Sequence, residues 1–267
     1  MRAGVFCTAG YTETGGLQEF LRKLRGDVAW ERCFPAVDKP APKLGRTIAA
    51  PRREHAGASG ERLAGAMLER LREHYSGDRC PFDFVLLADD ADCRFAERPD
   101  EMAAWHAELA RAVRSAVGHP LPVYVLLASP EVESWLLSDW EMGFGGQYHD
   151  IGIALRRHIG NCLLAGAGLT WDDLEDFGGR QVGGTCERKL SDALRDAIRA
   201  GGRCERCVPS AASAGADAPP TARLGYSKRH DGASMLKRIR PEQVRTRCSR
   251  YFAPAYAGLL GARAASG

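Results

Sequence analysis

The chain has 267 residues, with 37 lysines and arginines against 34 aspartates and glutamates and a formal net charge of +3. A chain of this length can bury a full core, so we expect one large domain or one domain with a substantial appendage. No stretch approaches about eighteen consecutive apolar residues, and no basic region followed by an apolar core opens the sequence. These absences predict a soluble, cytoplasmic protein with no membrane segment.

Nine cysteines are spread through the chain, at positions 7, 33, 80, 93, 162, 186, 204, 207 and 248. Their number is odd and their spacing forms no framework, so reduced thiols are expected. Cys204 and Cys207 have the spacing of a zinc knuckle, but a tetrahedral site needs two further ligands. Only the distant Cys186, His230 and Cys248 remain as candidates, so chance spacing is favoured over zinc.

Basic residues are concentrated in the second half of the chain. Between Arg180 and Arg250 there are sixteen lysines and arginines against seven acidic residues, whereas the rest has twenty-one against twenty-seven. An acidic part and a basic part fit a polyanionic substrate that one part holds and the other works on. The alternative is that the arginine-rich helices are merely solvated surfaces.

The first predicted strand covers residues 3–8 and leads through a glycine-containing turn over 9–16 into an amphipathic helix. A strand, a turn and a helix in this order begin an α/β unit. The turn can bind an anion at the helix N-terminus. It lacks the patterns of a phosphate loop and of a dinucleotide turn, so it gives little reason to expect nucleotide binding. The next predicted elements are a second strand over 30–38, a surface loop over 39–53 and a helix over 61–75.

Residues 82–92 predict a buried strand that ends in three carboxylates, Asp89, Asp90 and Asp92. In an extended chain Asp90 and Asp92 point the same way and Asp89 points the other way. Two carboxylates on one face make a hard-oxygen site suited to Mg²⁺ or Mn²⁺. Ligands of open α/β sheets also bind beyond the carboxyl ends of strands. The alternative is a polar loop that happens to be acidic.

A helix over 99–117 and a strand over 121–128 come next. Ser129 is predicted to cap the following helix, with Pro130 in its first turn. Glu133 lies off the apolar stripe of that helix and can face Asp90 if the two strands are neighbours. The alternative is that Glu131 and Glu133 only favour the positive end of the helix dipole.

The basic half contains a helix over 187–199 that carries Arg188 and Lys189, and then a run of small residues. In the last segment, basic residues are interleaved with aromatic ones, which suits phosphate contacts and base stacking along a nucleic-acid strand. Tyr251 and Phe252 are favoured instead as anchors that dock this segment on the core. Lys228 and Arg229 are left as candidate phosphate contacts.

Taken together, the elements predict an α/β protein with a mostly parallel sheet flanked by helices and a basic helical C-terminal portion. We expect an α/β core over 1–145 and a mixed, mainly helical extension over 146–207. A flexible linker or loop follows over 208–223. The helical segment 224–267 is expected to dock on the core.

Four motifs of the chain occur in this order in a known family. They are the element Ala9-Gly10-Tyr11-Thr12-Glu13, the pair Asp90-Ala91-Asp92, the run Glu133-Ser134-Trp135-Leu136-Leu137, and Tyr226-Ser227-Lys228 with Tyr251-Phe252. In this pattern, which spans most of the chain, the sequence resembles the bacterial TOPRIM-like proteins related to RloB. That largely uncharacterised family is often encoded beside an AAA-type ATPase in phage-defence or mobile loci. The resemblance implies a TOPRIM-like sheet.

The resemblance also implies a function, Mg²⁺-dependent (or Mn²⁺-dependent) phosphodiester hydrolysis of DNA or RNA in an anti-phage defence system. Asp90 and Asp92 would hold the metal, and Glu133 and Glu13 would be secondary ligands or the base. Lys228, Arg229, Arg188 and Lys189 are the candidate nucleic-acid contacts.

The family's first-strand glutamate is replaced here by Ala9. Glu13 lies about one helical turn further on and can substitute for it, or Glu133 can complete the cluster. The alternative is a catalytically degenerate subunit that still binds nucleic acid or an ATPase partner. Hydrolysis by a serine or cysteine nucleophile has little support, because no nucleophile-elbow motif occurs.

Overall fold

The structure is a computed structural model of the chain, and it describes residues 1–8, 10–35, 58–175, 181–182, 185–187, 189–200 and 225–263. Several features singled out in the sequence lie outside these residues: Ala9, Arg188, the Cys204 and Cys207 pair, the predicted loop 39–53 and the predicted linker 208–223. Among the described residues, no helix is both long enough and apolar enough to cross a membrane.

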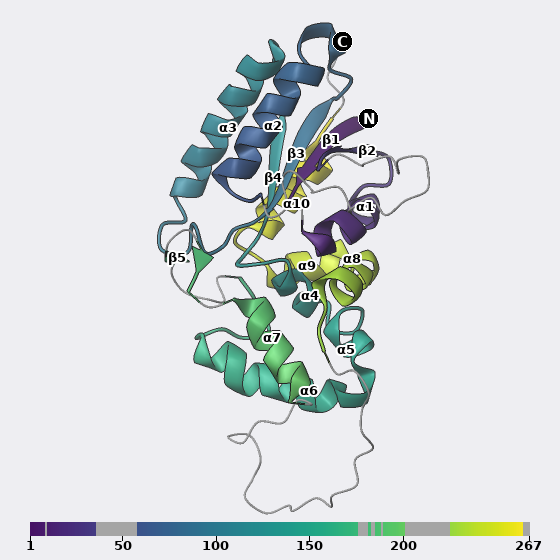
Figure 1. Cartoon of the computed structure of the whole chain (residues 1–267), viewed down its shortest axis with the longest axis vertical. Helices are drawn as coiled ribbons and strands as arrows, with labels where there is room; N and C mark the ends of the chain where they lie inside the picture. Colours follow the sequence, from purple (N-terminus) through teal and green to yellow (C-terminus); the bar gives the residue numbers. More distant parts are fainter. Residues whose placement is uncertain are drawn as a thin grey trace, which may run out of the picture.

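Four parallel strands form the central sheet, in the order β2-β1-β3-β4 (Figure 1). They are β1 (Arg2–Cys7), β2 (Ala29–Phe34), β3 (Phe84–Asp90) and β4 (Val123–Ala128). Strand β3 is buried along most of its length, as expected for a parallel strand covered on both faces. The predicted α/β fold with a parallel sheet flanked by helices is therefore confirmed. All four strands end at the same edge of the sheet.

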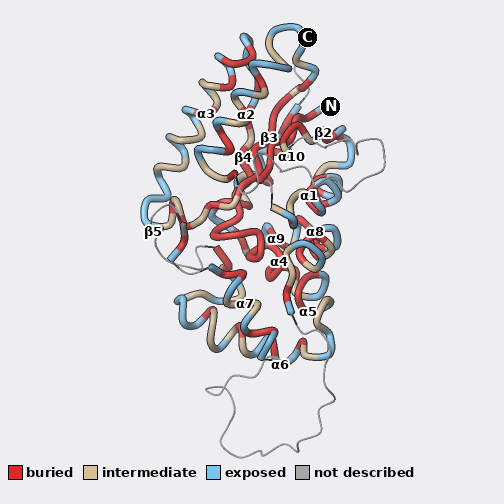
Figure 2. Tube along the Cα trace, viewed as in Figure 1, coloured by how far each residue is buried: buried red, intermediate tan, exposed pale blue. Residues whose placement is uncertain are grey.

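Alternating side chains of β3 enter two different apolar layers. Val85 and Leu87 face the layer of α2 (Glu61–His74) and α3 (Glu101–Val117), while Phe84 and Leu86 face the opposite layer. The opposite layer contains α1 (Tyr11–Leu24), α4 (Glu133–Ser138), α8 (Ala233–Arg238), α9 (Pro241–Arg247) and α10 (Phe252–Gly261). Figure 2 shows the buried residues running along the strands and through α4.

Three aromatic rings join the C-terminal helices to the rest of the second layer. Phe20 of α1, Trp135 of α4 and Phe252 of α10 lie with ring centroids between 5.1 and 5.9 Å apart. Tyr251 and Phe252 are 1% and 0% exposed. Glu175 accepts the backbone N–H groups of both residues, at 2.9 and 3.0 Å, close to the start of α10. These two aromatic residues are therefore anchors, as the sequence predicted.

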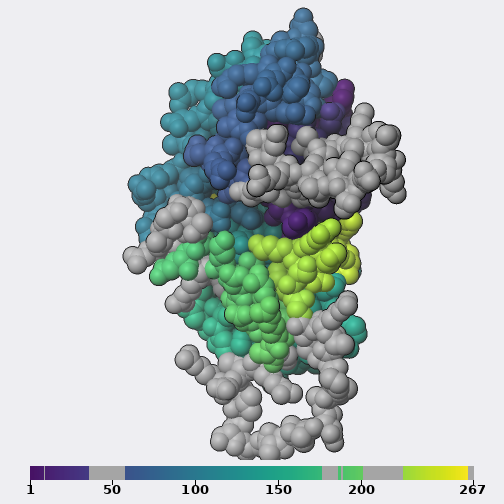
Figure 3. All heavy atoms as spheres, viewed as in Figure 1, coloured from purple at the N-terminus to yellow at the C-terminus, as the bar shows by residue number. Residues whose placement is uncertain are grey.

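Of the remaining main elements, the helices lie beyond α4, away from the sheet, whereas β5 lies beside the end of α3 (Figure 1). These elements are α5 (Phe144–Gln147), α6 (Gly152–His158), a π-helical continuation (Ile159–Leu164), the short strands β5 (Gln181–Val182) and β6 (Thr185–Cys186), and α7 (Leu190–Arg199). Figure 3 shows α7 (green) on the molecular surface beside the C-terminal segment (yellow).

Two local predictions are wrong. The glycine-containing turn over 9–16 is mostly helix, because α1 begins at Tyr11 and includes Gly15 and Gly16. The helix predicted to start at Pro130 begins at Glu133 instead, after a cis Ser129–Pro130 peptide bond. Ser129 is buried and does not cap it.

Gly16 is used for a close helix contact rather than for a turn. A Cβ atom at Gly16 would lie 2.7 Å from Cβ of Leu236 and 2.8 Å from the carbonyl oxygen of Ala233. Real Cβ atoms do not approach other atoms so closely. The missing side chain therefore lets α1 and α8 pack against each other.

Replacing Gly16 with alanine should lower the free energy of unfolding by about 1–3 kcal/mol, because the added methyl group overpacks the contact with α8. Gly65 is the matched control, since no atom lies within 4 Å of a Cβ added there. Gly65→Ala should raise the free energy of unfolding by up to about 1 kcal/mol through helix propensity. Urea unfolding of both variants tests this, and equal effects at the two positions would contradict it.

Candidate functional site

The end of β3 sends its carboxylates in different directions. Asp89 faces the α2 side, where its Oδ2 accepts the N–H of Gly60 at 2.7 Å and lies 3.6 Å from Arg94. Asp90 faces the other side, where its Oδ1 accepts the N–H of Val132 at 2.9 Å. This hydrogen bond joins the end of β3 to the segment that leads into α4. The predicted separation of Asp89 from Asp90 is confirmed.

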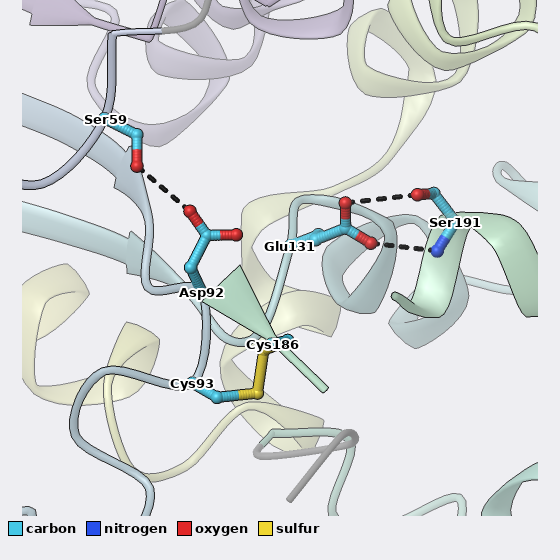
Figure 4. Close-up of a disulfide and its surroundings, with 6 residues drawn as sticks. All are labelled: Ser59, Asp92, Cys93, Glu131, Cys186 and Ser191. Carbon is cyan, nitrogen blue, oxygen red and sulfur yellow. Dashed lines mark hydrogen bonds between the residues drawn. A yellow bond between two sulfur atoms is a disulfide. The ribbon is translucent and has the colours of Figure 1, made fainter. Parts of the chain in front are cut away.

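Asp92 lies in a left-handed turn, so strand alternation does not orient it. The φ angles of Asp92 and Cys93 are +47° and +59°, a region that non-glycine residues seldom occupy. Ser59 donates a hydrogen bond to Oδ2 of Asp92 at 3.0 Å (Figure 4). Cys93 forms a disulfide with Cys186, so the prediction of reduced thiols is wrong for this pair. The disulfide links the turn to β6, just before α7.

Glu131 connects the segment after β4 to the start of α7. Its Oε2 accepts the backbone N–H of Ser191 at 2.9 Å and its Oε1 accepts the Ser191 hydroxyl at 3.1 Å. In Figure 4 its carboxylate lies on the same side of the disulfide as that of Asp92. Glu131 thus brings the N-terminus of α7 next to the carboxylates at the end of the sheet.

Lys228 supplies a positive charge to this group. Its Nζ lies 2.9 Å from Oε1 of Glu131 and 3.4 Å from Oε1 of Glu133. Burial opposes the charged form, but Glu133, Glu131 and Asp90 together raise the pKa of Lys228 above its usual value. The ammonium group is therefore the counter-charge of the carboxylates that surround it.

Glu133 is fully buried, and its two oxygen atoms differ. Oε1 accepts the hydroxyl of Tyr226 at 2.6 Å, whereas Oε2 has no hydrogen-bond partner. Burial raises the pKa of Glu133 even though Lys228 lowers it. A buried carboxylate oxygen without a donor is costly, so this atom is poised to accept a cation or a proton.

Glu13 joins the group from the first turn of α1. Burial, together with the nearby Glu133 carboxylate, raises the pKa of Glu13 to about 7. Burial also raises the pKa of Asp90 well above its usual value, and Glu13 adds to this effect while Lys228 opposes it. A carboxyl group with a pKa near 7, such as that of Glu13, exchanges protons near neutral pH, which is typical of acid–base sites.

The structure thus brings together Glu13, Asp90, Glu131, Glu133 and Lys228, which we call the carboxylate cluster. Asp92 lies at its border, where burial and Glu131 raise its pKa while the Ser59 hydrogen bond lowers it.

Of the predicted nucleic-acid contacts that the structure describes, one is paired with carboxylates and two are exposed. Lys228 is engaged within the carboxylate cluster. Arg229 is exposed, with its guanidinium 5.4 Å from the ring centroid of Tyr11. Lys189 is exposed at the start of α7.

Sequence reasoning did not select Glu131, because its partner Ser191 is sixty residues away. A glutamate just before a helix is also explained more simply by its favourable interaction with the helix dipole.

The donor chemistry of the carboxylate cluster suits a hard divalent cation, since its ligands are carboxylate oxygens and Glu133 Oε2 lacks a partner. Within the described ranges, however, no group of three histidine, cysteine, aspartate or glutamate side chains is already arranged to hold a metal ion. The Lys228 ammonium group pairs with two of the carboxylates instead. A cation would therefore have to compete with Lys228 for them.

Comparison of this chain with protein-family models, with curated proteins and with solved structures finds no match.

Lys228→Met should lower the free energy of unfolding at about pH 8 by roughly 1–3 kcal/mol, because it leaves buried carboxylates without their counter-charge. This is less than for a fully buried pair, since 35% of the Lys228 side chain is exposed. The carboxyl pKa values of Glu13, Asp90 and Glu133 are raised, so these groups take up protons as the pH falls. The loss should accordingly shrink toward about pH 5.

Urea unfolding at both pH values measures this effect. Lys237→Met removes a lysine from an exposed position on α8 and serves as the control, with little change at either pH. A loss for Lys228→Met that is equal at both pH values would contradict the assignment of Lys228 as counter-charge.

Proposed function

We propose that the carboxylate cluster performs Mg²⁺-dependent or Mn²⁺-dependent hydrolysis of phosphodiester bonds in DNA or RNA. The observation that carries this proposal is the convergence of Glu13, Asp90 and Glu133 at the carboxyl edge of a parallel sheet, with one buried Glu133 oxygen left without a donor. Ligands of open α/β sheets bind at this edge. The resemblance to the RloB-related TOPRIM-like proteins supports the same reaction and a role in anti-phage defence.

Asp90 and Asp92 are the residues proposed to hold the cation. When bound, the cation would polarise the phosphodiester and favour ionisation of the attacking water. Asp90 is fixed by the Val132 N–H and Asp92 by the Ser59 hydroxyl, so both carboxylates are oriented before substrate arrives. Glu131 and Lys228 pair with each other beside them.

Glu13 is the proposed general base. With a pKa of about 7, its carboxyl is about half ionised at neutral pH, which is the condition under which a group both takes and returns a proton efficiently. Its place on α1 differs from that of the family's first-strand glutamate, where this chain has Ala9. Arg229 and Lys189, both exposed, are proposed to contact phosphates.

The second candidate function is a catalytically degenerate subunit that binds nucleic acid or an AAA-type ATPase partner. It is favoured by the pairing of Lys228 with Glu131 and Glu133 and by the lack of a ready three-ligand metal group among the described residues. Such a subunit would bind nucleic acid in a salt-sensitive way without divalent metal.

Replacing Asp90 and Asp92 together with asparagine should reduce Mg²⁺-dependent or Mn²⁺-dependent cleavage of a labelled oligonucleotide by at least about a hundredfold, because both proposed metal ligands lose their charge. The control replaces Asp192 and Asp196, which are exposed on α7, with asparagine and should cleave normally. Cleavage that survives in the Asp90 and Asp92 variant would refute the metal assignment. Salt-sensitive binding with no cleavage by the unmodified protein would favour the degenerate subunit.

Glu13→Gln should lower the cleavage rate by about 10²- to 10⁴-fold, the usual contribution of a general base. Because the pKa of Glu13 is raised to about 7, the rate of the unmodified protein should rise as the pH increases through about 7 and then level off. That rise should be missing in the variant. Glu19→Gln, at an exposed position of the same helix, should keep both rate and profile, and an unchanged profile for Glu13→Gln would rule out its role as base.

A further inference from the structure

A cavity of about 520 Å³ lies on the helical part beyond α4, apart from the carboxylate cluster. It is formed by α5, α6, the π-helical continuation and the segment at Trp171. Among the described elements, α6 lies far from the N-terminus (Figure 1). Its volume is in the range of small-molecule sites. No residue of the carboxylate cluster lines it.

Two tryptophans form the aromatic wall of this cavity. The rings of Trp140 and Trp171 lie edge to face, with centroids 5.5 Å apart and an interplanar angle of 78°. A Cβ at Gly145 would lie 2.3 Å from Nε1 of Trp140, and one at Gly160 would lie 3.0 Å from Nε1 of Trp171. Glycine at these two positions therefore lets both indoles lie directly against the backbone. Both rings are only partly buried, so some of their surface stays open to a ligand.

The charged side chains of the cavity are basic. The guanidinium of Arg156 lies 5.9 Å from the ring centroid of Trp140 and 5.1 Å from that of Trp171. Arg157 also lines the cavity and is exposed, and so is His149, whose Nε2 lies 3.0 Å from Oδ1 of Asp150. None of the lining residues is acidic. The charge of the cavity therefore favours an anion and disfavours an ammonium ligand.

We propose that this cavity binds a nucleotide unit, that is, a nucleobase together with its phosphate. The base stacks on an indole face or on the planar guanidinium of Arg156, and the phosphate contacts Arg157. Aromatic rings next to arginines suit this chemistry because every base has a π-face and every nucleotide a negative charge. The unit can belong to a free nucleotide or to a single-stranded nucleic acid. The proposal does not rest on the reaction of the carboxylate cluster.

The test measures binding in EDTA, so that cleavage cannot interfere. Fluorescence anisotropy follows fluorescein-labelled single-stranded 12-mers of DNA and RNA, and calorimetry follows AMP and ATP. One variant replaces both Arg156 and Arg157 with alanine, and another is Trp171→Leu. The control replaces Arg111 and Arg114 of α3 with alanine, which removes the same charge from a different surface. Thermal melts check that each variant is folded, and the arginine variant changes only exposed positions.

The proposal predicts that at least one class of probe binds and that the arginine variant weakens this binding by at least tenfold, while the control changes it less than threefold. Trp171→Leu should weaken it about five- to a hundredfold, the usual effect of losing one stacking platform. Binding of the 12-mers but not of AMP or ATP assigns the cavity to single strands, and the converse assigns it to free nucleotides. No binding of any probe at millimolar concentration overturns the proposal, and so does an equal loss in the control. Because this binding is measured in EDTA and depends on Arg156, Arg157 and Trp171, the two proposals can fail separately.

Discussion

The structure depends on a balance of charge at the carboxyl edge of the sheet. Asp90, Glu131 and Glu133 lie near one another in a largely dry environment, where like charges repel strongly. Two contributions make this arrangement tolerable. The first is the ammonium of Lys228, bonded to Glu131 and close to Glu133. The second is protonation, which the raised pKa values of Asp90 and Glu133 favour. A site held in this way responds readily to an incoming cation or proton.

The charge balance also explains why the C-terminal helices are packed so closely on the α/β core. Lys228 and Tyr226 precede α8, so their position depends on the contact of α8 with Gly16 of α1 and on the burial of Phe252. Thr12 of α1 donates a hydrogen bond to the carbonyl oxygen of Lys228 at 3.0 Å. The two ends of the chain therefore meet at the site, and loss of the C-terminal anchors would remove its counter-charge.

Sequence periodicity was sufficient for most of the elements, because strands such as 82–92 and helices such as 61–75 have strong apolar patterns. It also placed Asp90 and Glu133 at the carboxyl edge of the sheet, where the structure has them. Sequence periodicity failed where contacts between distant segments determine the position of a side chain. Asp92 leaves the strand pattern in a left-handed turn, and Lys228 was interpreted as a phosphate contact because its carboxylate partners lie about a hundred residues away. Long-range pairing of this kind leaves no local signal.

The central claim is that this charge-balanced cluster is a cation site. A measurement of divalent-cation binding tests it most directly. Calorimetric titration with Mg²⁺ and Mn²⁺ would be carried out on the unmodified protein and on the Asp90→Asn, Asp92→Asn variant, each with and without a short oligonucleotide, since substrate phosphate can complete the coordination of such sites. We expect binding by the unmodified protein, at least with the oligonucleotide present, and none by the variant. Equal binding by both proteins, or no binding by the unmodified protein under either condition, would contradict the claim.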